Sequence, residues 1–127
     1  MTPGPEIARY PYETAITAYG NGGFRFAEMS HRGSIICLPS GVYAWNASSA
    51  EALADNDIDF ILSRLSPPIT VLLGTGEKQL WPPPHVYAAF AKAGIGLEPM
   101  STGAAARTYN ILIAEKRTIA AALIAVP

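Results

Sequence analysis

The sequence has one cysteine, few charged residues and no long apolar run. Cys37 alone can form neither an intrachain disulfide nor a multi-cysteine metal site, and a reducing compartment fits this usage. Charged residues make up 15% of the 127 residues, against about 25% in an average domain. Nine basic and ten acidic residues give a net charge of −1, so we expect no binding of nucleic acid.

Targeting and membrane-spanning signals are also missing. The first six residues have no basic start followed by an apolar stretch, so no signal peptide is predicted and we expect a cytoplasmic protein. The longest apolar run covers 119–126 and is much shorter than the ~20 residues that cross a bilayer. The sequence therefore predicts no insertion into a membrane.

Apolar residues are abundant, at 50% of the chain, which excludes an intrinsically disordered protein. The length predicts one α/β domain over 13–127, preceded by a proline-rich segment, 1–12, that is extended or frayed. A chain with so little charge leaves apolar area on its surface. We therefore expect at least a weak homodimer, formed through the N-terminal third or through an exposed sheet edge.

The first third of the sequence reads as antiparallel β structure. Apolar and polar residues alternate in 14–19 and 24–27 around a turn at Gly20–Gly23, which predicts a hairpin. A second turn is predicted at His31–Gly33. Two short strands follow, at 34–38 and 42–45.

Helices and strands alternate through the rest of the chain. Apolar residues at helical spacing predict the helices, and Pro or Gly marks several of their ends. The predicted elements are a helix from an N-cap at Asp55, Asn56 or Asp57 to Leu65, a buried strand at 69–73, a helix at 85–93, a strand at 96–100, a helix capped by Ser101 or Thr102, and a strand at 118–126. This order predicts an α/β sandwich with a mixed sheet.

The first candidate site is Gly74-Thr75-Gly76, at the end of the buried strand, where open α/β sheets place ligands. No Gly-Lys-Ser/Thr follows, and the third glycine of a dinucleotide-binding fingerprint is missing, so neither nucleotide motif is present. The segment is either a tight turn that needs small residues or the floor of a small-ligand site.

The second candidate is the start of the third predicted helix. Its free backbone N–H groups from Gly103 onward, the hydroxyls of Ser101 and Thr102, and the side chain of Arg107 could bind an anion together. The other interpretation is a capped helix in which Arg107 forms a structural ion pair with Glu98 or Glu115.

Two polar residues further along this helix belong to the same candidate site. Thr108 and Asn110 are both disfavoured inside helices. Thr108 also falls on the apolar stripe, where it either bonds back to a carbonyl or serves a site. If the strands at 69–73 and 96–100 are parallel neighbours, Gly74–Gly76 lies within one side chain's reach of Thr102 and Arg107.

No catalytic constellation is visible. His31 and His85 share no metal-ligand spacing, and Cys37 lies in an apolar strand typical of an inert core thiol. No nucleophile-elbow or zinc-protease motif is present. We therefore predict no catalytic residue, no metal site and no cofactor.

Several short segments occur in an order that resembles a known family. They are Gly22–Phe26, Gly33–Ile35, Pro39–Val42, Leu72–Gly76, Pro82–Pro84, Gly94–Gly96, Met100–Thr102, Ala106–Asn110, Leu112 with Glu115 and Arg117, and Ala120–Leu123. The ordered set is similar to the family called domain of unknown function 498, and the resemblance covers about residues 14–126.

The resemblance implies a three-layer β+α/β/α domain with a central mixed sheet. The family includes a mitochondrial complex I assembly factor and many small bacterial proteins, and this chain is similar to the bacterial branch. The resemblance implies a non-catalytic accessory protein that binds other proteins, among them subunits of respiratory complex I. The alternative is a protein or enzyme that binds a small anionic ligand between Gly74–Gly76 and Thr102–Arg107.

Overall fold

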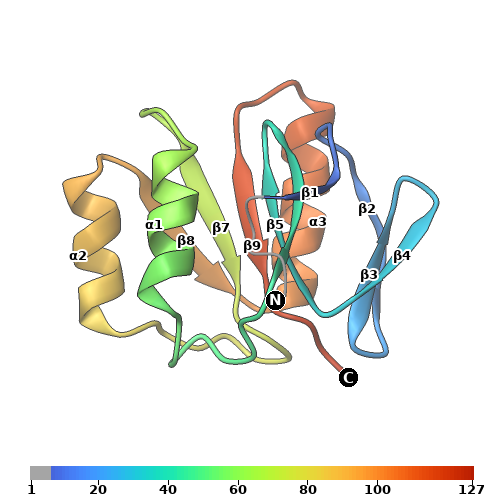
Figure 1. Ribbon diagram of the computed structural model, residues 1–127, viewed down its shortest axis with the longest axis horizontal. Coiled ribbons are helices and arrows are strands. Elements are labelled where there is room, and N and C mark those ends of the chain that lie inside the picture. Colours follow the sequence, from blue (N-terminus) through green and yellow to red (C-terminus); the bar gives the residue numbers. More distant parts are fainter. Residues whose placement is uncertain (1–6) are drawn as a thin grey trace.

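A six-stranded mixed sheet forms the middle layer of the protein, seen in the computed structural model, which describes residues 7–127 (Figure 1). In spatial order its strands are β1 (Ala8–Tyr10), β6 (Gly41–Trp45), β5 (Ser34–Leu38), β9 (Ala120–Leu123), β7 (Thr70–Gly74) and β8 (Gly96–Met100). β7 pairs in parallel with β8 and β9, whereas β9, β5, β6 and β1 pair in antiparallel fashion. The predicted mixed sheet is confirmed.

Helices cover one face of this sheet, and a helix with a second sheet covers the other (Figure 1). The first face packs against α1 (Asp55–Ser63) and α2 (Pro84–Lys92). The second packs against α3 (Thr102–Ala114) and a small antiparallel sheet of β2 (Ile16–Gly20), β3 (Gly23–Phe26) and β4 (Met29–Arg32). The expected three-layer β+α/β/α sandwich with a β-rich N-terminal third is therefore confirmed.

The strand β7 is buried at four of its five residues, as its continuous apolar sequence predicts. It has strands on both sides but lies next to the edge strand β8, because β9 returns from the end of the chain to separate it from β5. Its partner β8 follows through α2, so both strands end at the same edge of the sheet. This arrangement brings the loop after Gly74 next to the start of α3.

The predicted N-cap of α1 at Asp55, Asn56 or Asp57 is wrong. The N-cap residue is Ala54, which supplies no side-chain bond. Asp57 lies inside the helix, where its Oδ2 accepts from Trp45 Nε1 at 2.9 Å. Burial raises the pKa of Asp57, although this hydrogen bond lowers it. The carboxylate is therefore used to join α1 to the sheet.

The predicted turn at His31–Gly33 is right only at Gly33, a bend with a φ of 98° between β4 and β5, because His31 and Arg32 belong to β4. The chain turns earlier, at Ala27 and Glu28, whose φ values of 49° and 63° are those of a two-residue hairpin turn. Neither residue type indicates such a turn in the sequence. Residues 1–6 of the segment expected to be extended or frayed lie outside the described part, and 8–10 form β1.

Candidate functional site

The loop after β7 and the first turn of α3 meet at the edge of the central sheet. The Gly76 N–H donates to Thr102 Oγ1 at 3.0 Å, and the Thr102 N–H donates to the Gly76 carbonyl at 2.8 Å. A Cβ on Gly74 would lie 3.0 Å from both Cα and Oγ1 of Thr102. The two segments singled out in the sequence are therefore in direct contact, and Gly74 is needed for this close approach.

The hydroxyl groups at this junction bond to the protein itself. Thr102 is fully buried, and its Oγ1 donates to the Ile124 carbonyl at 2.7 Å. Thr75 is also buried; its Oγ1 donates to the Lys78 carbonyl at 2.6 Å and accepts from the Leu80 N–H at 2.9 Å. Both hydroxyls hold the loop in shape, which is the role expected of a tight turn.

The first turn of α3 is capped from within. Ser101 is the N-cap, and its Oγ accepts from the Ala104 N–H at 3.3 Å, while the Ala105 N–H donates to the Ser101 carbonyl. Gly103 is covered by two side chains: a Cβ there would collide with the Tyr19 hydroxyl and lie 3.4 Å from an Arg107 guanidinium nitrogen. The side chains of Tyr19 and Arg107 thus converge over the start of the helix.

Arg107 is exposed and reaches back toward Gly103. Among the described residues, the ion pair of Glu115 is with Arg117 at 3.8 Å and not with Arg107. Thr108 is partly buried on the same helix. Binding of an anion at this helix start stays a prediction.

Asn110 lies away from this junction and holds β2 against α3. Its Oδ1 accepts from the Ile16 N–H at 2.8 Å, and its Nδ2 donates to the Ile16 carbonyl at 2.7 Å. Both bonds occupy backbone groups that face away from β3. The side chain therefore takes the place of a neighbouring strand along this part of β2.

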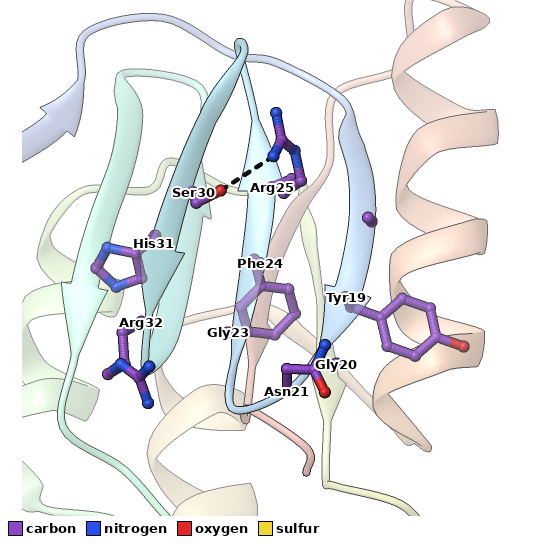
Figure 2. A pocket seen from close by; sticks show the side chains of 10 residues that line it. Tyr19, Gly20, Asn21, Gly23, Phe24, Arg25, Ser30, His31 and Arg32 are labelled. Carbon is purple, nitrogen blue, oxygen red and sulfur yellow. Dashed lines mark hydrogen bonds between the residues drawn. The ribbon is translucent and has the colours of Figure 1, made fainter.

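The outer face of the small sheet is hollowed, with a cavity volume of about 420 Å³ (Figure 2). Its floor carries small side chains or none, at Ala18, Gly20 and Gly23. Arg25 and Arg32 border it, and Arg25 donates to Ser30 Oγ at 3.2 Å. Sequence reasoning missed this surface because it placed Arg32 in a turn.

A second hollow, of about 570 Å³, lies beside the C-terminal end of α3. Thr70 and Glu98 line it from β7 and β8, and Leu112 and Arg117 line it from α3 and the segment after it. It opens at the beginning of the parallel strands, whereas the predicted ligand site is at their ends. The two therefore do not coincide.

The titratable groups of the interior are poor candidates for catalysis. Cys37 is fully buried, and burial raises the pKa of its thiol far above the ordinary range. Burial also raises the pKa of Tyr109. Within residues 7–127, no group of three or more His, Cys, Asp or Glu side chains could hold a metal ion. No helix of the described part is long and apolar enough to span a bilayer.

Residues 16–124 match a family described as "Protein of unknown function (DUF498/DUF598)". The chain belongs to this family. The match covers every described strand and helix except β1, so the resemblance read from the ordered segments is confirmed.

Two curated relatives carry informative names. The mouse protein called NADH dehydrogenase (ubiquinone) 1 alpha subcomplex assembly factor 3 is 31% identical over 94% of this chain and 65% of its own length. A Francisella tularensis protein called "13 kDa major membrane protein" is 36% identical over 58% of this chain and 58% of its own length. This chain thus spans less than two thirds of each of these two relatives.

A solved structure shares the fold along the whole domain. The crystal structure of a protein described as an outer membrane protein, from Bartonella henselae, is 48% identical and superposes with a TM-score of 0.86. The superposition covers 94% of this chain and 100% of that one. The three-layer arrangement is therefore shared with a close relative.

Proposed function

We propose that this family member is a non-catalytic accessory protein that binds other proteins and assists the assembly of respiratory complex I. The observation that carries the proposal is the similarity to the mouse assembly factor, which extends over 94% of this chain. The family match at 16–124 contains every described strand of both sheets except β1. The shared part is thus the folded domain itself.

The interior of the protein supports a binding role over a catalytic one. The hydroxyls of Thr75 and Thr102, at the predicted ligand site, are engaged with the backbone. Cys37 is too deeply buried to serve as a nucleophile. The outer face of the small sheet is an accessible polar surface, which suits contact with another protein.

The proposal places the protein in the cytoplasm, at or near the membrane in which complex I is built. The free, buried thiol of Cys37 is compatible with a reducing compartment. The Francisella tularensis relative is called a major membrane protein, so a fraction of this protein at the membrane is expected. Subcellular fractionation with antibody detection measures this distribution.

Deletion of the gene in the organism that encodes it tests the proposal. Membranes from the deletion strain should contain less assembled complex I on native gels and oxidise NADH more slowly with a quinone acceptor. Succinate oxidation serves as the control and should not change. Normal levels of complex I in the deletion strain would refute the assembly role.

A second candidate function is the binding of a small anion at the start of α3. The specific observation in its favour is that the Tyr19 hydroxyl and the Arg107 guanidinium converge over Gly103. A thermal-shift screen of phosphorylated and carboxylated metabolites tests it, since a ligand at 100 times its dissociation constant adds about 2.7 kcal/mol of stability. An Arg107→Ala variant should lose the shift, and the absence of any shift would remove this function.

A further inference from the structure

We propose that β4 is a docking edge at which an extended acidic segment of a partner protein joins the small sheet as a fourth strand. This inference rests on the proposed function, because it presumes a protein partner. Three features of the fold support it: the blocking of the other sheet edges, the outward direction of backbone groups on β4, and the arginines on β3 and β4.

Three of the four described sheet edges have features that hinder the addition of another strand. The outer edge of β2 lies beside α3, where Asn110 bonds both backbone groups of Ile16. The outer edge of β8 contains Pro99, which has no N–H, and the Pro99 carbonyl accepts from Gln79 Nε2 at 2.9 Å. The edge strand β1 has three residues and an irregular register. These are the devices by which proteins block the addition of strands.

The remaining edge, β4, is left available. It is the last strand of the small sheet, and in the described part of the chain no strand pairs with its other side (Figure 1). The Gly33 N–H donates to the Gly22 carbonyl at 2.7 Å, and the pairing of Phe26 with Met29 closes the two-residue turn. Because hydrogen-bonded positions alternate along an antiparallel pair, Ser30 and Arg32 direct their backbone groups outward.

The side chains at this edge identify the chemistry of the partner. Ser30 and Arg32 project onto the hollowed outer face, and Arg25 reaches Ser30 from the neighbouring strand. Both arginines are exposed (Figure 2). Residues two apart on one face of a strand are about 6.8 Å from each other. A segment with acidic residues at positions i and i+2 therefore places one carboxylate opposite Arg32 and the other near Arg25.

A second copy of this chain fits the edge less well. Pairing of β4 with another β4 would bring the arginines of both copies onto one sheet face, and like charges across strands are unfavourable. The acidic residue of this hairpin, Glu28, lies in the turn next to Arg25 and not on β4, so β4 itself offers a second copy no carboxylate. The acidic segment is thus the better occupant, and pairing between copies is an outcome of the test.

The proposal is tested by nuclear magnetic resonance on the full chain labelled with nitrogen-15. The probe is a seven-residue peptide in which glutamate alternates with threonine, capped at both ends. The matched control peptide has lysine in place of glutamate. We expect the glutamate peptide to shift the amide signals of Ser30 and Arg32 and to slow their exchange with solvent. The lysine peptide should leave them unchanged.

Four variants separate the contributions of charge and backbone. R25E/R32E should weaken binding of the glutamate peptide at least tenfold, whereas K78E/K92E, with the same change in net charge at exposed positions elsewhere, should not. Ser30→Pro removes an outward N–H and should weaken binding more than Ser30→Ala, which also lacks the hydroxyl that accepts from Arg25 but keeps the N–H. Thermal unfolding of each variant verifies that it is folded.

Several results would overturn the proposal. They are no binding of the glutamate peptide, equal binding of the lysine peptide, unaltered binding by R25E/R32E, and unaltered binding by Ser30→Pro. Light scattering that shows a dimer dissociated by R25E/R32E would instead assign β4 to pairing between copies. Full retention of complex I in the deletion strain, with peptide binding intact, would refute the assembly role alone. If the deletion strain has less complex I and expression of the R25E/R32E variant restores it completely, only the docking edge is refuted.

Discussion

Replacement of Asn110 by alanine should loosen the small sheet from α3. The variant loses two hydrogen bonds to the backbone of Ile16, of 2.8 and 2.7 Å. Ile16 is 4% exposed, so water cannot freely replace the lost partner. Each such bond contributes about 0.5–1.5 kcal/mol net, and leaving its buried partner unpaired costs about 1–3 kcal/mol. We therefore expect the free energy of unfolding to fall by about 2–3 kcal/mol.

This loss corresponds to a large change in melting temperature. At about 2.1 cal/mol/K of unfolding entropy per residue, a chain of this length should melt about 7–11 °C lower. Circular dichroism during heating measures the shift, and urea titration gives the free energy. Ile111→Ala is the matched control, because Ile111 is on the same helix and 58% exposed; its melting temperature should change little.

Amide hydrogen exchange locates the effect. The Ile16 amide should exchange faster in the Asn110→Ala variant, while the amide of Val71, in the buried strand β7, should keep its protection relative to global unfolding. A melting temperature within about 2 °C of the wild type would refute the reasoning, since at least one of the two bonds would then contribute almost nothing.

Three further predictions concern buried or half-buried side chains. Thr102→Val should destabilise the protein by about 2–3 kcal/mol in urea titrations, because the Ile124 carbonyl and the Gly76 N–H lose their partner, whereas Thr102→Ser should retain most of the stability. The thiol of Cys37 should react with a thiol reagent only in denaturant, since it is fully buried; rapid reaction of the native protein would contradict this. On balance the pKa of His31 lies below 6.5 in the folded state: burial lowers it most, a backbone hydrogen bond with Ser34 raises it, and the charge of Arg9 lowers it. The folded protein therefore binds this proton less readily than the unfolded chain, so stability present above about pH 6.5 is lost as the pH falls through the folded pKa. His31→Gln should lose less stability than the wild type on acidification, and parallel pH curves would contradict the assignment.

The elements of the second half of the fold could be predicted because their determinants are local. The strand β8 has the predicted bounds, Gly96–Met100, since Gly94 ends α2 and Ser101 caps α3. The helix α2 begins at Pro84, where the proline run makes a start favourable. Apolar spacing and terminating residues within a few positions carry this information.

The roles of the candidate residues could not be predicted, because their partners are distant in the sequence. Asn110 bonds a residue 94 positions away, and the Thr102 hydroxyl bonds one 22 positions away. Both are polar residues in a helix, a pattern that fits a ligand site equally well. The turn at Ala27 and Glu28 was hidden for a different reason, since it lacks the glycine or asparagine that usually marks positive φ.

The same polar residues explain why the outer surface is a better candidate for a functional site than the interior. Ser34 follows the pattern of Asn110 and Thr102: its Oγ donates to the Ala47 carbonyl at 2.7 Å and accepts from the Ala125 N–H at 2.9 Å. In each case a side chain completes the bonds of backbone groups that no strand or helix satisfies. A bond used in this way can be given up to a substrate only with a loss of stability. Within residues 7–127, the one side-chain hydrogen bond of the arginines of the small sheet is that of Arg25 with Ser30, so their guanidinium groups are available to a partner.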